Sequence, residues 1–169
     1  MLNRRIAATV AALILAAPAA ASARPNDFPE DRSFLTNAAQ SNLAEIATGR
    51  LALRESEDAA VRAYARRMVA DHTAAQAQLR RIARAWKTSI PSRPSPKQRR
   101  DAARLKALEG STFDRTYLRR QITAHRQALG LCLLEIDGGR VGDLRAYAAN
   151  TAPVVRVHLT MAKETRAAL

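Results

Sequence analysis

The sequence predicts an all-α protein built as an antiparallel four-helix bundle, and three observations lead to this fold class. Apolar residues recur at three- and four-residue steps. No stretch alternates apolar and polar residues as a β-strand does. The helical segments fall into two pairs on either side of a proline-rich connector. An apolar content of 47% in 169 residues argues against disorder and allows a buried core.

The N-terminus has the pattern of an export signal. Arg4 and Arg5 precede a small apolar run over residues 6–20, and Ala21-Ser22-Ala23 is the small-x-small pattern that signal peptidase accepts. An uncleaved membrane anchor is the alternative, but this alanine-rich run falls short of the ~20 strongly apolar residues of a span. We therefore expect cleavage after Ala23 and a location in the periplasm or cell envelope. The expected organisation is a signal peptide over 1–23, a flexible N-terminus over 24–32 and one helical domain over 33–167.

The first pair of helices predicts an antiparallel hairpin. One helix is expected from about Ser33 to Leu53, where apolar residues follow helical spacing. The second is expected from an N-cap at Ser56 to about Trp86. Because the break between them is very short, the two helices should pack side by side.

The proline-rich connector and the second pair of helices follow in the sequence. Prolines and serines over 87–97 cannot continue a helix, and a short basic helix is expected over 97–108. Ser111 and Asp114 have the spacing of a capping box that opens a third long helix, which should run to about Ile136. The last helix either begins anew at Pro153 or continues through it with a kink. Two hairpins joined by a long crossover between the second and third long helices are the ferritin-like arrangement, with a Pro-kinked or split last helix.

Each of the three histidines falls near the middle of an apolar stripe on a different long helix. His72, His125 and His158 therefore form either a buried hydrogen-bonded network or a metal site, since imidazole is a common ligand of transition metals such as iron and zinc. Carboxylates that could complete such a site are Glu45, Asp71 and Asp114. Simpler roles are a helix cap for Asp114 and a solvent-facing or supporting acid for Asp71.

Three arguments favour the network over the metal site. The Glu-x-x-His signature of ferritin-like di-iron sites is absent before all three histidines. Folding the first hairpin about residue 55 places His72 opposite roughly residue 39, about 9 Å along the axis from Glu45. The same reasoning places His158 opposite roughly residue 119, which is not level with His125. Asn42 and Gln121 also enter the inner face and suit a hydrogen-bonded network.

The remaining chemistry of the chain is sparse. No nucleophile with a matching base and no glycine-rich phosphate loop is present, so an enzyme of a known hydrolytic or cofactor class is not expected. Cys132 is the single cysteine, which excludes an internal disulfide, and its position on an apolar helical face predicts a buried thiol.

The charge is strongly positive, with a formal net value of +13 that remains high after Arg4 and Arg5 are removed. An aromatic content of 4% is too low for a base-stacking surface, and nucleic acid is not an expected partner of an exported chain. The charge is either a solvated surface or a means of attraction to anionic lipid or cell-wall polymer through residues 97–104.

Several segments together resemble a known family. They are Phe34 to Ala39 with Leu43-Ala44-Glu45, Ala65 to Thr73 with its Met-x-x-Asp-His motif, Gly110 to Leu118 with Phe113-Asp114 and Tyr117, His125, and Ala152 to Leu159. In this order they are similar to exported bacterial ferritin-like proteins catalogued as domain of unknown function number 4142. The resemblance covers about Phe34 to Met161, and Ala152-Pro153 replaces the family's usual Leu-Pro. It implies a helical bundle outside the cytoplasm and no settled activity.

Three hypotheses of function follow from the sequence. The first is a non-enzymatic periplasmic bundle with a structural, stress-protective or binding role. The second is a metal-binding or metal-dependent redox bundle that uses its inward-facing histidines. The third is a peripheral binder of anionic membrane or cell-wall polymer.

Overall fold

The computed structural model describes residues 28–169, which form five α-helices and, within that range, no β-strand. The helices are α1 (Pro29–Glu55), α2 (Ala59–Ala85), α3 (Pro96–Lys106), α4 (Gly110–Gly138) and α5 (Gly142–Ala167). The all-α class is confirmed. The predicted signal peptide and its cleavage site lie outside the described residues.

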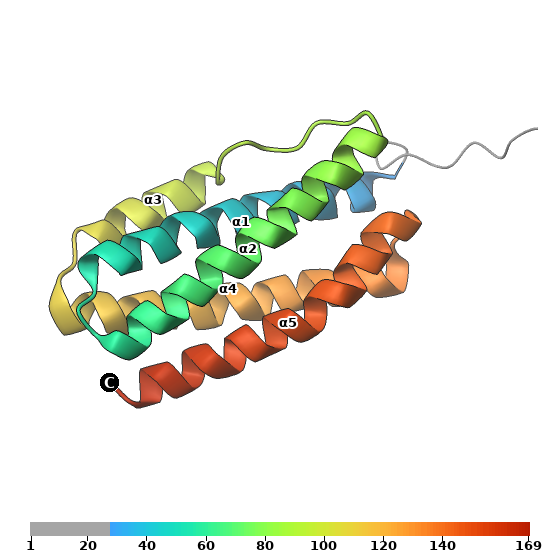
Figure 1. Ribbon diagram of the computed structural model, residues 1–169. Coiled ribbons are helices and arrows are strands. Elements are labelled where there is room, and N and C mark those ends of the chain that lie inside the picture. The colour runs from blue at the N-terminus through green and yellow to red at the C-terminus, as the bar shows by residue number, and fades with distance from the viewer. Residues whose placement is uncertain (1–27) are drawn as a thin grey trace, which may run out of the picture.

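The four long helices pack in a ring, in the order α1, α2, α5, α4 (Figure 1). Short turns join α1 to α2 and α4 to α5, so each of these pairs is an antiparallel hairpin. The extended connector after α2 leads to α3, which lies along α1 and brings the chain back to the start of α4. No helix in the described part of the chain combines the length and the apolar character needed to cross a membrane.

Helix α1 begins at Pro29, earlier than the expected start near Ser33. Proline fits the first turn of a helix because the amide hydrogen that it lacks has no acceptor there. Glu30 and Asp31 follow in the same turn, where negative charge is favoured by the helix dipole.

The two predicted caps are wrong, and each correction has a local cause. Asp58 caps α2, because its carboxylate accepts hydrogen bonds from the amides of Ala60 and Val61 at 2.9 Å, while Ser56 ends α1. The capping box is formed by Ser95 and Gln98 at the start of α3. Helix α4 starts at Gly110 without a side-chain cap, so the Ser111–Asp114 box does not form.

Pro153 lies inside α5, which is a single helix. The sequence left open whether the last helix is split at this residue, and the structure resolves the question in favour of continuity. The residues up to Asn150 therefore belong to the same helix as the segment that carries His158.

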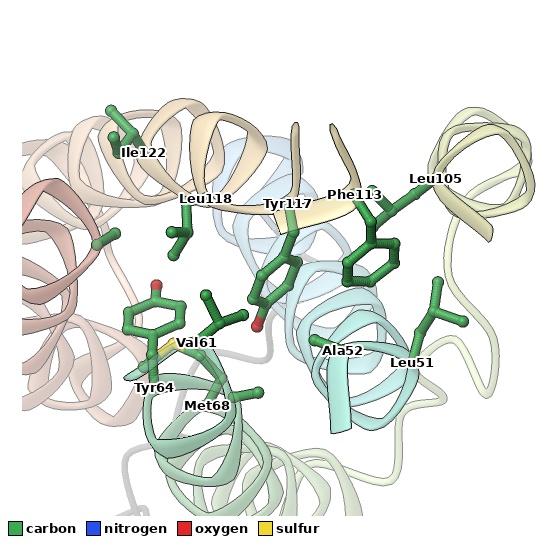
Figure 2. Close-up of a cluster of buried hydrophobic side chains, with 12 residues drawn as sticks. Leu51, Ala52, Val61, Tyr64, Met68, Leu105, Phe113, Tyr117, Leu118 and Ile122 are labelled. Carbon is green, nitrogen blue, oxygen red and sulfur yellow. The ribbon is translucent and has the colours of Figure 1, made fainter. Parts of the chain in front are cut away.

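The core is divided into two apolar clusters. The first contains side chains from α1, α2, α4 and α5 and also Leu105 of α3, which Figure 2 shows beside Phe113. The second lies toward the other end of the long helices and is built around Phe34, Leu79 and Tyr147. Along each long helix, polar residues stand between the segments that enter the two clusters. The functional candidates other than Asp114 lie in or next to this middle region.

Candidate metal centre

The middle region is a layer of buried polar side chains, which we call the polar layer. Its members are Asn42 and Glu45 on α1, His72 and Gln76 on α2, Gln121 and His125 on α4, and His158 on α5. Buried polar groups need hydrogen-bond partners or a bound ion, because loss of hydration is otherwise uncompensated. The layer therefore has to be explained by its contacts.

The three histidines converge. Their ring centroids lie 5.3 to 5.6 Å apart, and one nitrogen of each ring lies within 4.8 Å of the others. The expectation that His158 would not be level with His125 is therefore wrong. The first turn lies around residue 57 rather than 55, which places His72 beside Asn42. The second turn follows Gly138 and brings His158 level with His125.

Each imidazole is oriented by an oxygen on its outer side. His72 Nδ1 lies 2.9 Å from Asn42 Oδ1, and His125 Nδ1 lies 2.9 Å from the carbonyl oxygen of Gln121. His158 Nε2 lies 2.9 Å from Asp71 Oδ2. All three oxygens are acceptors here, since the amide nitrogen of Asn42 already points to other residues. Each facing nitrogen is thus the protonated one and donates the hydrogen bond.

The inward-facing nitrogens carry the lone pairs of the neutral rings. They are Nε2 of His72, Nε2 of His125 and Nδ1 of His158. Nε2 of His72 is buried and has no hydrogen-bond partner. The other two nitrogens lie 3.3 Å apart. Two lone pairs at this distance repel each other unless a cation, either a proton or a metal ion, lies between them.

Burial favours the neutral form of His72 and His158. It lowers the pKa of His72 to about 3, and the neighbouring rings of His125 and His158 act in the same direction. Burial also lowers the pKa of His158, although the hydrogen bond to Asp71 opposes that shift. Neutral imidazole is the form that binds metal ions.

Asp71 lies outside the three nitrogens as the partner of His158, and it also pairs with Arg67 one turn earlier on α2. Burial opposes ionisation of this carboxyl, but hydrogen bonds from Arg67 and His158 lower its pKa. A carboxylate that accepts from the far nitrogen of a metal-binding histidine fixes the ring and increases its basicity. The predicted role of Asp71 as a supporting acid agrees with this position.

Glu45 does not join the three histidines. It accepts a hydrogen bond of 2.6 Å from Gln121 Nε2, and Gln121 Oε1 accepts one of 3.1 Å from Tyr64. Burial raises the pKa of Glu45, against the opposing effects of His125 and Gln121. Glu45 is therefore joined to His125 only through the residue Gln121, whose backbone orients that ring.

Asp114 is also remote from the cluster. It lies on α4 about three helical turns before His125, which corresponds to roughly 16 Å along the axis. Its carboxyl group is buried beside the first apolar cluster, and its Oδ1 has no hydrogen-bond partner. The structure thus separates Asp114 from the metal-ligand candidates.

Sequence reasoning placed Asn42 and Gln121 on the inner face but missed Gln76 and Tyr147, which contact Asn42. Asn42 Nδ2 donates to Tyr147 at 3.1 Å and lies 3.4 Å from Gln76 Oε1. Gln76 is four residues after His72, the spacing that places two side chains on one helix face, and this signal could have identified it. Cys132 is buried, as predicted, and burial raises its pKa to about 11.

A cleft of about 490 Å³ lies on the α1–α4 side of the polar layer. Glu45 and Gln121 line its inner part, and Lys97, Arg119 and Arg120 are among its other lining residues. None of the three histidines lines it. The cleft therefore reaches the supporting residues and stops short of the imidazole nitrogens.

Comparison with known proteins gives a family and a fold. The model of a family described as "Domain of unknown function (DUF4142)" matches residues 15–165. A crystal structure of a DUF305 fragment from Deinococcus radiodurans superposes with a TM-score of 0.74 at 19% sequence identity, covering 83% of this chain and 97% of that one. At this identity the likeness shows a shared fold only. No curated protein matches the chain.

Proposed function

Because the chain belongs to the DUF4142 family, whose description states no activity, function has to be argued from its own residues, and we propose that this protein binds a transition-metal ion. The ligands are His72, His125 and His158. The observation that carries the proposal is the convergence of three imidazole nitrogens whose opposite nitrogens are all engaged by outer acceptors.

The geometry suits a small divalent ion. Two nitrogens bound at about 2.0 Å to one tetrahedral zinc ion lie about 3.3 Å apart. His125 and His158 already present their nitrogens at 3.3 Å. His72 would have to move inward by a side-chain adjustment to complete the set. Three nitrogens with a fourth position open to water or another small ligand suit Zn²⁺, and iron is the alternative that imidazole ligands allow.

We place the ion in a storage, buffering or structural role rather than in catalysis. The three rings are 7%, 1% and 1% exposed, so a substrate has little access to them. The α1–α4 cleft ends on Glu45 and Gln121. The signal-like N-terminus supports a periplasmic location, and the crossover between α2 and α4 supports assignment to the ferritin-like bundles.

The test is metal stoichiometry in the mature chain, purified without a histidine tag and exposed in turn to zinc, iron, copper and manganese. We expect about one ion per chain in the wild type, because three imidazoles form one site. His72→Ala and His158→Ala should each lose it. Gln76→Ala is the matched control, since it removes a buried member of the polar layer that offers no imidazole.

Absence of bound metal in the wild type, together with lower stability of both histidine variants, would contradict the proposal. That result would make the three rings hydrogen-bonding members of the core. Equal metal content in Gln76→Ala and the histidine variants would also count against it, since any disturbance of the layer would then have the same effect.

A further inference from the structure

The outer partners of the three histidines differ in their access to solvent. Asn42 and Gln121 are 5% and 3% exposed and are enclosed by the long helices. The Asp71 side chain is 25% exposed, and it is the partner of His158. Among these three partners, Asp71 is the one whose side chain reaches solvent to a substantial extent. It does so where α2 packs against α5.

Arg67 covers the solvent-exposed side of Asp71. Its guanidinium donates to Asp71 Oδ2, the same oxygen that faces His158 Nε2. The Arg67 side chain is 55% exposed, so it lies on the solvent side of the carboxylate. Its positive charge therefore lies next to the outer partner of His158 and repels a cation that approaches from solvent.

The α1–α4 cleft is a poorer path for a cation. Lys97, Arg119 and Arg120 line it against the single carboxylate of Asp101 and the buried carboxyl of Glu45. Gln121 closes its inner end with side-chain bonds to Glu45 and Tyr64. A divalent ion would have to pass three cationic groups and then displace this amide.

We propose that the metal ion reaches the three histidines through the α2–α5 seam at Asp71, and that Arg67 is the residue that restrains this step. The inference rests on the proposed function. The hydrated ion first meets the Asp71 carboxylate and displaces the Arg67 guanidinium from it. It then exchanges bound water for the three imidazole nitrogens, and Asp71 keeps its hydrogen bond from His158 Nε2. No bond other than metal–ligand and hydrogen bonds changes.

The experiment measures the rate of zinc binding by stopped-flow with a fluorescent zinc indicator, at low and high salt. Arg67→Gln should bind zinc about fivefold faster than the wild type at low ionic strength, because one positive charge no longer opposes a divalent ion near the surface. The gain should shrink at about 0.5 M salt, where the Debye length is short. Asp71→Asn should bind more slowly and, through loss of its support of His158, about tenfold more weakly.

Two controls separate this route from general charge effects. Arg66→Gln makes the same change of net charge at an exposed neighbouring residue and should leave the rate close to that of the wild type. Arg120→Gln tests the α1–α4 cleft on the opposite side of the polar layer and should also leave the rate close to that of the wild type.

Equal acceleration by Arg66→Gln and Arg67→Gln would overturn the proposal, because net charge alone would then explain the rates. Acceleration by Arg120→Gln with no effect of Arg67→Gln would overturn it in favour of the α1–α4 cleft. In both cases the wild type still holds zinc at equilibrium, and the proposed function stands. A wild type that binds no zinc removes both proposals together.

Discussion

Glu135 carries a buried carboxyl group that contacts the carboxyl group of Asp31. Asp31 is fixed by the amides of Arg140 and Val141, which donate to its Oδ1 at 3.0 and 2.8 Å. Burial raises the pKa of Glu135 to about 8, and the charge and hydrogen bonding of Asp31 add to the shift, whereas Arg145 opposes it. This pair was not predictable from the sequence, because Asp31 also fits the simpler role of an acid in the first turn of α1.

The raised pKa predicts a pH-dependent stability. The folded state holds the Glu135 proton from about 4.5, the ordinary value, up to about 8, so the free energy of unfolding should fall as pH rises through this window. Glu135→Gln keeps a hydrogen-bond donor beside Asp31 without the charge. We expect the variant to be more stable than the wild type at pH 9 by about 1–2 kcal/mol and similar to it near pH 4.5. Urea unfolding at both pH values measures this.

Glu164→Gln is the control for that comparison, because Glu164 is exposed. Its difference in stability from the wild type should not depend on pH in the same way. If the wild type and Glu135→Gln kept the same difference at pH 4.5 and pH 9, the proton on Glu135 would have no part in stability.

At the level of the helices, apolar periodicity identified the long helical segments. Local capping interactions decided the residues at which those helices begin. Ser56 and Asp58 are both good N-cap residues, and only the structure shows that Asp58 is the one used. Moving a turn by one residue moves the facing residue by two, or about 3 Å along the axis. The first turn lies about two residues later than the sequence-based register assumed, so the residue facing His72 changes from roughly residue 39 to Asn42. Cap choice depends on backbone geometry, which composition does not specify.

Asp58→Ala tests the cap that sets this register. The change leaves two amides at the start of α2 without their acceptor, and it should lower the free energy of unfolding by about 1 kcal/mol. Glu57→Ala removes a neighbouring acid that forms no part of the cap and serves as the control. Chemical denaturation measures both. A larger loss in Glu57→Ala than in Asp58→Ala would contradict the assigned cap.

Across the whole molecule, the polar layer separates two apolar clusters and joins all four long helices. The all-α class and the helix pairs were predictable, because apolar spacing reports them directly. The inward position of the three histidines was also predictable. Their convergence was not, since it depends on two turns and on the continuity of α5 through Pro153.

Binding of an ion by residues from α2, α4 and α5 should stabilise the whole fold. At a free zinc concentration about 100 times Kd, mass action adds about 2.7 kcal/mol, which raises Tm by about 5–10 °C in a chain of this size. The shift should be absent in His158→Ala. Thermal unfolding followed by circular dichroism, with and without zinc, measures it. An equal shift in the variant would place the bound zinc elsewhere.

The most direct measurement is X-ray absorption at the zinc edge on the loaded mature chain and on His158→Ala. We predict a first shell with three imidazole nitrogens at about 2.0 Å and one further light ligand. The variant should lose one imidazole contribution or fail to hold zinc. A shell of oxygen ligands without imidazole scattering, or a spectrum unchanged in His158→Ala, would contradict the assignment of the three histidines as a metal centre.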